Sequence, residues 1–218
     1  MTPVPDYSIV TELPGGRASR EQISRLYHRY RTAAAYAWGK DVLEVGCGAG
    51  QGMGYLARRA RRLIGGDYTD ANLRHARRHY HGKARLVRFD AHHLPFPGAS
   101  FDLVVLFEAL YYLARPEDFL AESRRVLRNG GTLLVSTVNC DWADFNPSPF
   151  SVRYFSAPDL AACLRRGKFE AELYGAYPVA NETARAKAVS ALKRSAMTMG
   201  LMPRTMKGKE IFKRVFFG

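Results

Sequence analysis

Alternating glycines near residue 48 form the clearest candidate for a ligand-binding loop. They stand at positions 46, 48 and 50, directly after the apolar run 41–45. Glycines let a backbone approach a ligand closely and adopt positive φ in a tight turn. The dinucleotide fingerprint Gly-x-Gly-x-x-Gly fails in both registers, because Gln51 and Met53 occupy the third glycine position. The loop is therefore a candidate site for a cofactor other than a nicotinamide dinucleotide.

Two acidic residues follow the next apolar runs, where a parallel sheet would present them to the same ligand. Asp67 follows the run 63–66, and Asp90 follows the run 84–89. A carboxylate only accepts hydrogen bonds, so Asp67 is suited to binding both hydroxyls of a ribose. A simpler interpretation stays open for each acid: Asp67 as a solvated surface acid, and Asp90 as the cap of a turn.

Apolar runs typical of strands alternate with segments of helical periodicity through the middle of the chain. Predicted strands cover residues 41–45, 63–66, 84–89, 101–107 and 132–138, and predicted helices cover 53–62, 72–80 and 117–127. Strands separated by helices imply an α/β fold with a doubly wound, mostly parallel sheet and helices on both faces. In such a sheet the ligand lies at the carboxyl ends of the strands, where the glycine loop and the two acids would meet.

The chain is predicted to be one domain over residues 1–218, with additions at both ends of the core. Residues 1–39 comprise an aperiodic arm and an amphipathic helix, which begins with a capping box between Ser19 and Gln22. Residues 40–138 form the cofactor-binding core, and residues 139–218 supply substrate-side and C-terminal elements. In this last part we expect a helix at 157–165, an edge strand at 170–177, a helix at 183–199 and a final segment at 211–217.

Taken in order, these motifs resemble the class I S-adenosylmethionine-dependent methyltransferases, especially the group called methyltransferase type 11. The resemblance covers roughly residues 40–138. It rests on Val-Leu-Glu-Val-Gly-Cys-Gly-Ala-Gly at 42–50, Gly-Asp-Tyr at 66–68, Asp-Ala at 90–91, Leu-Pro-Phe at 94–96, Phe-Asp-Leu-Val-Val at 101–105 and Arg-Val-Leu-Arg-Asn-Gly-Gly at 125–131. It implies a Rossmann-like methyltransferase fold with a seven-stranded sheet, and S-adenosyl-L-methionine as the cofactor.

The resemblance also assigns roles to individual positions. The glycine loop would approach the methionine and ribose portions of the cofactor, the acid at 67 would bind the ribose hydroxyls, and the carboxylate at 90 with the next backbone amide would read the adenine. The cofactor-binding residues implied in this way are Glu44, Gly46, Cys47, Gly48, Gly50, Asp67, Tyr68, Asp90, Ala91 and Phe107.

The chemistry of methyl transfer requires little of the protein beyond positioning. Displacement at a sulfonium is in-line, so the protein holds the nucleophile in line and excludes water. The candidate catalytic residues are Glu108 and Tyr112, which follow the predicted strand 101–107. Glu108 would orient an amine or accept a proton, and the alternative is a carboxylate that stabilises a helix start. Many members of the family that the sequence resembles carry histidine at the position of Tyr112. Because this chain has tyrosine there, a histidine base is not expected.

Neither metal chemistry nor disulfide chemistry is indicated. His92 and His93 follow Asp90, but adjacent loop residues seldom converge on one ion, so no metal site is expected. The cysteines at positions 47, 140 and 163 are widely spaced and are predicted to be reduced thiols.

Composition indicates a soluble cytoplasmic protein with a preference for anionic partners. No apolar stretch reaches the about 18 residues of a membrane span, and residues 1–10 lack the features of a signal peptide. The formal charge of +13 favours anionic small molecules, nucleic acid or an acidic membrane surface. Residues 185–218 carry nine lysines or arginines and would contact a membrane peripherally, or would close the sheet with a solvated basic face.

The expected function is methyl transfer from S-adenosylmethionine to an oxygen or nitrogen of a small molecule, such as a natural product, a sugar or a lipid-linked precursor. An anionic acceptor fits the charge. Two alternatives stay open: an RNA methyltransferase, which the basic charge favours although no nucleic-acid motif follows residue 107, and a non-catalytic cofactor-binding protein on the same fold.

Overall fold

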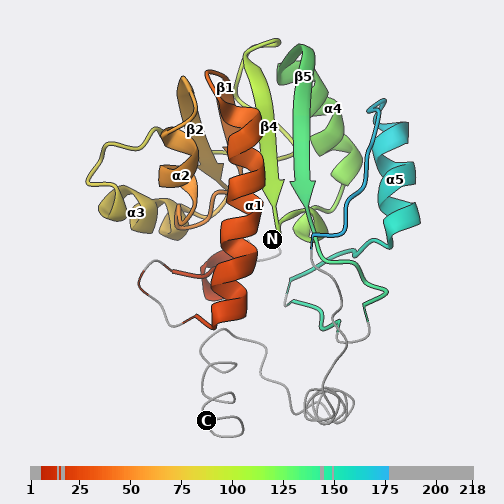
Figure 1. The fold of residues 1–218 in the computed structure, drawn as a ribbon, viewed down its shortest axis with the longest axis horizontal. Coiled ribbons are helices and arrows are strands. Elements are labelled where there is room, and N and C mark those ends of the chain that lie inside the picture. Colours follow the sequence, from red (N-terminus) through yellow and green to blue (C-terminus); the bar gives the residue numbers. More distant parts are fainter. Residues whose placement is uncertain (1–5, 14, 16–17, 143–144, 149, 177–218) are drawn as a thin grey trace, which may run out of the picture.

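The computed structural model describes residues 6–13, 15, 18–142, 145–148 and 150–176. Within them, five strands form one parallel sheet in the order β3-β2-β1-β4-β5 (Figure 1). The strands are β1 (Asp41–Val45), β2 (Arg62–Asp67), β3 (Leu86–Arg88), β4 (Phe101–Phe107) and β5 (Leu127–Ser136). The helices are α1 (Arg20–Ala37), α2 (Met53–Ala57), α3 (Asp70–His79), α4 (Pro116–Val126) and α5 (Ala157–Arg166), with 3-10 turns η1 (Tyr7–Ile9) and η2 (Leu110–Tyr112). The predicted doubly wound α/β fold is confirmed.

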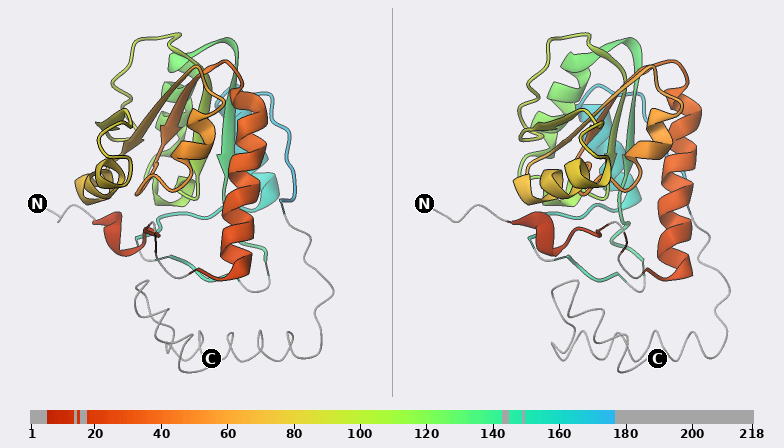
Figure 2. Two further views of the ribbon diagram at one scale, coloured as in Figure 1. Left: turned by 60° about the vertical axis from the view of Figure 1, so that its left-hand side comes forward. Right: turned by 90° about the vertical axis from the view of Figure 1, so that its left-hand side faces the viewer.

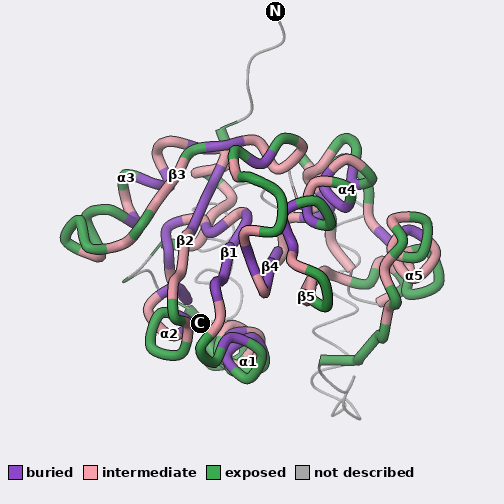
Figure 3. Tube along the Cα trace, turned by 90° about the horizontal axis from the view of Figure 1, so that it is seen from above, coloured by how far each residue is buried: buried purple, intermediate pink, exposed green. Residues whose placement is uncertain are grey.

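Helices cover the sheet on both faces, and each strand divides its side chains between them. Seen along the strands, α1 and α2 lie on one face and α4 on the other (Figure 3). Val42, Leu103 and Val105 pack with the buried alanines of α1, whereas Leu43 and Val104 belong to the cluster that includes α4. Because β1 is covered on both faces, all five of its residues are buried, including the charged residues Asp41 and Glu44.

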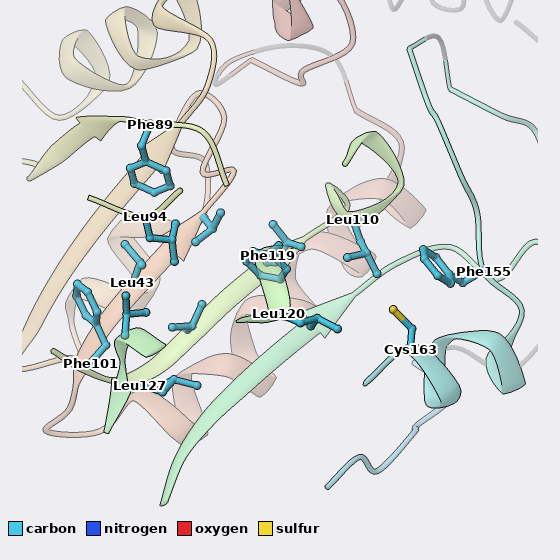
Figure 4. Close-up of a cluster of buried hydrophobic side chains, with 14 residues drawn as sticks. Leu43, Phe89, Leu94, Phe101, Leu110, Phe119, Leu120, Leu127, Phe155 and Cys163 are labelled. Atoms are coloured by element: carbon cyan, nitrogen blue, oxygen red, sulfur yellow. The ribbon is translucent and has the colours of Figure 1, made fainter. Parts of the chain in front are cut away.

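The larger core cluster lies on the α4 face. It brings together Phe101 at the start of β4, Phe119 and Leu120 on α4, and Cys163 on α5 (Figure 4). Phe155 joins the same cluster from the segment before α5 and is 1% exposed. The core therefore continues past β5 and ties the segment around residue 155 to the sheet.

The helix before the sheet has the start that its sequence predicts. Ser19 accepts from the backbone N–H of Gln22 at 3.2 Å, and Gln22 accepts from the backbone N–H of Ser19 at 2.9 Å. This capping box satisfies donors at the N-terminus of α1 and fixes where the helix begins.

Two predicted elements differ from those in the structure by five residues at one end. The helix predicted at 53–62 ends at Ala57, because the following backbone bonds to the start of β1: Arg61 N–H donates to the Lys40 carbonyl at 2.9 Å. The strand predicted at 132–138 begins earlier, since Leu127 already pairs with Phe101 before the turn at Gly130.

The edge strand predicted at 170–177 is wrong over the residues that the structure describes. Residues 170–176 have no strand structure, and residues 172–176 are exposed. A strand requires a hydrogen-bonded neighbour, and this segment pairs with no strand of the described sheet. Of the seven strands expected, five are present in the described ranges. The predicted helix at 183–199 and the segments at 185–218 and 211–217 lie outside them.

Several segments gather beyond the carboxyl ends of the strands. Figure 2 shows η1 and the chain after β5 on this side of the sheet, next to the N-terminal turns of α1. This edge is where a parallel sheet presents its loops to a ligand.

Candidate functional site

A cavity of about 740 Å³ lies at this edge of the sheet. Its walls come from the N-terminal arm, α1, the glycine loop, the ends of β2 and β4, and the chain near residue 150. Ten of the twelve residues predicted for the site line it: Gly46, Cys47, Gly48, Asp67, Tyr68, Asp90, Ala91, Phe107, Glu108 and Tyr112. Glu44 and Gly50 are absent from its wall.

The glycine loop has the backbone conformation that its composition suggests. Gly46, Gly48 and Gly50 have φ values of +69°, +56° and +81°. L-residues adopt this region only with strain, so side chains are disfavoured here. A Cβ on Gly48 would also lie 3.1 Å from Cγ2 of Thr11. The loop therefore presents bare backbone to the cavity at Gly46 and Gly48.

Asp67 holds the end of β2 to this loop. Its Oδ2 accepts from the backbone N–H of Gly48 at 2.9 Å, and its Oδ1 accepts from the backbone N–H of Thr69 at 2.8 Å and from Nδ2 of Asn72 at 3.2 Å. Burial raises the pKa of this carboxyl above its ordinary value, and the three donors oppose the rise. Asp67 therefore has a positioning role in addition to lining the cavity.

Glu44 lies behind the loop instead of on the cavity wall. It is 2% exposed, and its Oε1 accepts from the hydroxyl of Tyr30 on α1 at 2.5 Å. Oε2 has no hydrogen-bond partner among the described residues. Burial raises the pKa of this carboxyl to about 7, although the Tyr30 hydroxyl lowers it. Glu44 thus contacts α1, and its predicted role in cofactor binding stays a prediction.

Gly50 is likewise turned away from the cavity. The hydroxyl of Tyr80 donates to its carbonyl at 2.5 Å, and a Cβ at this position would lie 2.9 Å from the Tyr80 ring. Gly50 therefore allows α3 to pack against the loop, which is a structural reason for the third glycine.

Asp90 and Ala91 line the cavity beside the loop that follows β3. Oδ1 of Asp90 contacts Nδ1 of His92 at 2.5 Å, and Nε2 of His92 accepts from the backbone N–H of Arg115 at 3.2 Å. Partial burial acts to raise the pKa of Asp90, but donors of His92 outweigh it and leave the pKa below its ordinary value. His92 is thus a local hydrogen-bond partner of Asp90 and of the Arg115 backbone.

Glu108 stands at the end of β4 in an unusual backbone conformation. Its φ of +50° is in the left-handed region, and its N–H donates to the Ser136 carbonyl at 2.8 Å. Its Oε1 lies 2.9 Å from Nη1 of Arg29 and accepts from the Ser136 hydroxyl at 3.1 Å. These partners from α1 and β5 hold the carboxylate in one place on the cavity wall.

Tyr112 joins three segments around the cavity. Its hydroxyl lies 2.6 Å from Oγ of Ser148, and its ring centroid lies 5.0 Å from that of Tyr7 in η1. Burial raises the pKa of the Tyr112 phenol. The Tyr7 ring also meets the Tyr68 ring edge-on at 6.2 Å, so the arm covers part of the site.

Sequence reasoning missed several residues of the cavity wall. Thr11 accepts from Nδ2 of Asn72 at 3.0 Å, which ties the arm to α3. Tyr7, Thr11, Asn72 and Arg29 all line the cavity. The arm has no sequence periodicity from which its position could be predicted. Arg29 could have been found, because its spacing from Leu26 and Tyr30 puts the three residues on one face of the helix.

Among the residues that the structure describes, no group of three or more histidine, cysteine, aspartate or glutamate side chains is arranged to hold a metal ion. No helix in the same ranges is long and apolar enough to cross a membrane. All three cysteines are free, and burial raises the pKa of the Cys47 thiol well above its ordinary value.

The donor set fits an adenosyl cofactor. Gly46 and Gly48 form a backbone cradle that a Cβ would crowd, and Asp67 supplies a carboxylate beside it. Ala91 and Phe107 add apolar wall. A carboxylate suits ribose hydroxyls, and an apolar wall suits an adenine ring and a methyl group.

Comparisons with known proteins agree with this geometry. Residues 43–135 match the model of a family described as a methyltransferase domain. A probable S-adenosylmethionine-dependent methyltransferase of Mycolicibacterium smegmatis is 40% identical over 66% of this chain and 57% of its own. The chain therefore contains a class I S-adenosylmethionine-dependent methyltransferase domain.

Two further relatives have named substrates. A phthiotriol/phenolphthiotriol dimycocerosates methyltransferase of Mycobacterium ulcerans is 38% identical over 68% of this chain and 57% of its own. A fatty-acid O-methyltransferase of Mycolicibacterium smegmatis is 42% identical over 50% of this chain and 41% of its own. The chain thus spans about half the length of the curated relatives it matches.

Solved structures share the fold. A methyltransferase-like protein of Bacillus halodurans superposes with a TM-score of 0.60 at 24% identity, covering 69% of this chain and 71% of its own. The cyclase SpnF superposes with a TM-score of 0.66 at 22% identity, covering 98% of this chain and 93% of its own. A cyclase among these neighbours shows that the fold hosts more than one chemistry.

Proposed function

We propose that this protein transfers the methyl group of S-adenosylmethionine to an oxygen or nitrogen of a small, lipid-like molecule by direct in-line displacement. The observation that carries the proposal is one cavity that contains both the bare backbone of Gly46 and Gly48 and the polar side chain of Glu108 at the end of the neighbouring strand. Cofactor and acceptor would then meet beyond the carboxyl ends of β1 and β4.

Residues of β1, β2 and β3 would hold the cofactor. The backbone at Gly46 and Gly48 would approach its methionine and ribose parts, and Asp67 would accept from the ribose hydroxyls while it keeps its bond to the Gly48 N–H. Asp90 and the backbone amide of Ala91, which line the same cavity, would contact the adenine. When bound, the cofactor supplies a methyl group on a sulfonium, which is already activated for displacement.

Residues at the end of β4 would position the acceptor. Glu108 is held by Arg29 and Ser136, so it offers a fixed polar group to an acceptor. Tyr112 and Tyr7 form an aromatic wall and exclude water from the reacting atoms. Fixing the nucleophile in line lowers the entropic part of the barrier, which is the main contribution required of the protein here.

The lipid-like acceptor class is supported by the relatives and by the cavity. The relatives named above act on phthiotriol dimycocerosates and fatty acids, as their names state. The cavity wall of this chain includes apolar side chains near the acceptor end, among them Leu26, Val138, Phe150 and Val152. Such a wall suits an acyl or alkyl group.

Titration calorimetry with S-adenosylmethionine and S-adenosylhomocysteine tests the cofactor, and transfer of a radiolabelled methyl group to lipid-extract fractions tests the reaction. We expect saturable binding of both ligands and label in an organic-soluble product. Absence of binding would sink the proposal. Binding of both ligands without transfer to any fraction would support the alternative of a non-catalytic cofactor-binding protein.

A further inference from the structure

A half-buried arginine, Arg29, stands next to Glu108 on the cavity wall. Nη1 of Arg29 lies 2.9 Å from Oε1 of Glu108, and the Arg29 side chain is 19% exposed. Arg29 lines the cavity together with Glu108. Burying a guanidinium is unfavourable unless its donors are paired, and the buried Nε of Arg29 has no hydrogen-bond partner among the described residues, so this side chain keeps a donor for an anion beside its ion pair with Glu108.

The position of Arg29 is set by α1. Leu26, Arg29 and Tyr30 fall on one face of this helix, and all three line the cavity. Tyr30 is 7% exposed, and its hydroxyl bond to Glu44 anchors this turn of α1 to β1. Arg29 is therefore presented by a rigid element, which favours a defined contact with a ligand over a mobile surface charge.

The wall on the other side of the acceptor end is apolar. Phe150 and Val152 line the cavity and are 42% and 61% exposed, although both are large apolar side chains. Val152 is held there by its backbone, whose N–H donates to the Tyr111 carbonyl at 2.8 Å. A half-buried cation and exposed apolar groups on the wall of the same cavity fit an amphipathic anion.

We infer that the methyl acceptor is an aliphatic carboxylic acid, that Arg29 binds its carboxylate, and that the product is its methyl ester. The inference rests on the proposed function. One carboxylate oxygen forms a bond to the methyl carbon while the sulfur–methyl bond breaks, and the bonding electron pair remains on sulfur as a neutral thioether. No proton moves. The negative acceptor and the positive sulfonium become two neutral products.

Two features of the site favour this reaction over the methylation of an alcohol or amine. Oε1 of Glu108 already accepts from two donors, Arg29 and Ser136, so of this carboxylate only Oε2 is left to accept a proton from an alcohol or amine. A carboxylate needs no base at all. The reaction also neutralises opposite charges, which is favoured in a site that excludes water.

Three acceptors with the same chain test the inference: dodecanoate, dodecan-1-ol and dodecylamine, each with radiolabelled S-adenosylmethionine and the full-length protein. We expect label to appear as methyl dodecanoate only. Methylation of the alcohol or the amine at a rate equal to or above that of the acid overturns the inference, and so does failure of dodecanoate to be methylated.

Substitution of Arg29 tests the assigned contact. Arg29→Gln is expected to raise KM for dodecanoate about 10- to 100-fold, the usual effect of losing a hydrogen bond to a charged group, while Arg29→Lys retains part of the binding. Arg31→Gln is the matched control, because Arg31 is exposed on the same helix and lies over the Tyr27 ring, outside the cavity. An unchanged KM in Arg29→Gln contradicts the assignment.

Cofactor affinity separates this inference from the function on which it rests. S-Adenosylhomocysteine should bind the Arg29→Gln and Arg31→Gln variants as it binds the parent protein, which also shows that both variants fold. If the parent protein binds no cofactor, the proposed function fails. If it binds cofactor and methylates another lipid but not dodecanoate, only the carboxylate inference fails.

Discussion

The backbone N–H of Gly48 donates to Oδ2 of Asp67 at 2.9 Å and so joins the loop after β1 to the end of β2. Two motifs that lie 19 residues apart in the sequence therefore form one unit. The Asp67 carboxylate also accepts from the Thr69 N–H and from Asn72, so three donors converge on it from the loop and from the start of α3. Because one of these donors is the Gly48 N–H, we expect a change at Asp67 to alter the shape of the glycine loop as well as the proposed ligand contact.

Asp67→Asn should weaken the binding of S-adenosylhomocysteine about 10- to 100-fold. An amide has one acceptor oxygen, so its NH₂ group would face either the Gly48 N–H or the Thr69 N–H. Calorimetry measures the affinity. The control Asp70→Asn removes a carboxylate that pairs with Arg74 on the surface of α3, and it should leave the affinity unchanged. Equal affinities for both variants would contradict the role given to Asp67.

Gly48→Ala should reduce both stability and cofactor affinity, whereas Gly39→Ala should reduce stability alone. Both glycines have positive φ, +56° and +67°, so each substitution introduces backbone strain of about 1 kcal/mol. A Cβ at position 48 meets Thr11 at 3.1 Å and enters the cavity wall, while a Cβ at position 39 meets nothing within 4 Å. Chemical denaturation measures the stability of the two variants, and calorimetry measures their cofactor affinity. A loss of affinity in Gly39→Ala would show that backbone strain alone lowers the affinity.

Much of the fold could be predicted because local signals and tertiary packing agree. β1 and β4 have the limits predicted, since both are short runs dominated by valine, leucine and phenylalanine, and α1 begins at its capping box. The predicted strand at 170–177 shows the opposite case. Only the alternation of apolar and polar residues indicated this strand. A strand depends on hydrogen bonds to a neighbouring strand, and no local pattern specifies that neighbour.

The candidate site could be predicted only in part, for a related reason. Residues on strand ends and in the glycine loop were found because their motif is local. Glu44 lies behind the loop, because Leu43 and Val45 pack on the α4 face and Glu44 between them therefore points toward α1. Tyr7 and Thr11 reach the cavity through contacts with Tyr112 and Asn72, which no spacing in the sequence reveals.

Glu44→Gln should stabilise the unligated protein relative to the parent as the pH rises. Burial raises the pKa of Glu44 to about 7, from 4.5 for an ordinary carboxyl. Between these values the folded state holds a proton that the unfolded state has released, so the parent loses stability as pH rises through this window. The free energy of unfolding of the parent falls by roughly 3 kcal/mol between pH 4.5 and pH 8 for this reason. Glutamine mimics the protonated carboxyl at every pH, so the variant avoids this loss.

Urea denaturation at pH 5, 6, 7 and 8 would measure this difference. Glu21→Gln is the control, because Glu21 is an exposed residue of α1 whose side chain is 68% accessible. The stability gap between parent and variant should widen with pH for Glu44→Gln and stay constant for Glu21→Gln. A gap that is constant for both would contradict the pKa assigned to Glu44.

Tyr112→Phe should raise KM for the acceptor by up to about 5-fold and leave the shape of the pH–rate profile unchanged. Burial raises the pKa of this phenol, so it stays protonated near neutral pH and is unsuited to act as a base. Its hydroxyl contacts Ser148 at 2.6 Å, and loss of that contact would loosen the chain that carries Phe150 and Val152. Steady-state kinetics across pH 6–9 would decide: loss of a titrating limb in the variant would identify Tyr112 as an acid or base, whereas a change in KM alone identifies it as a residue that positions the acceptor wall.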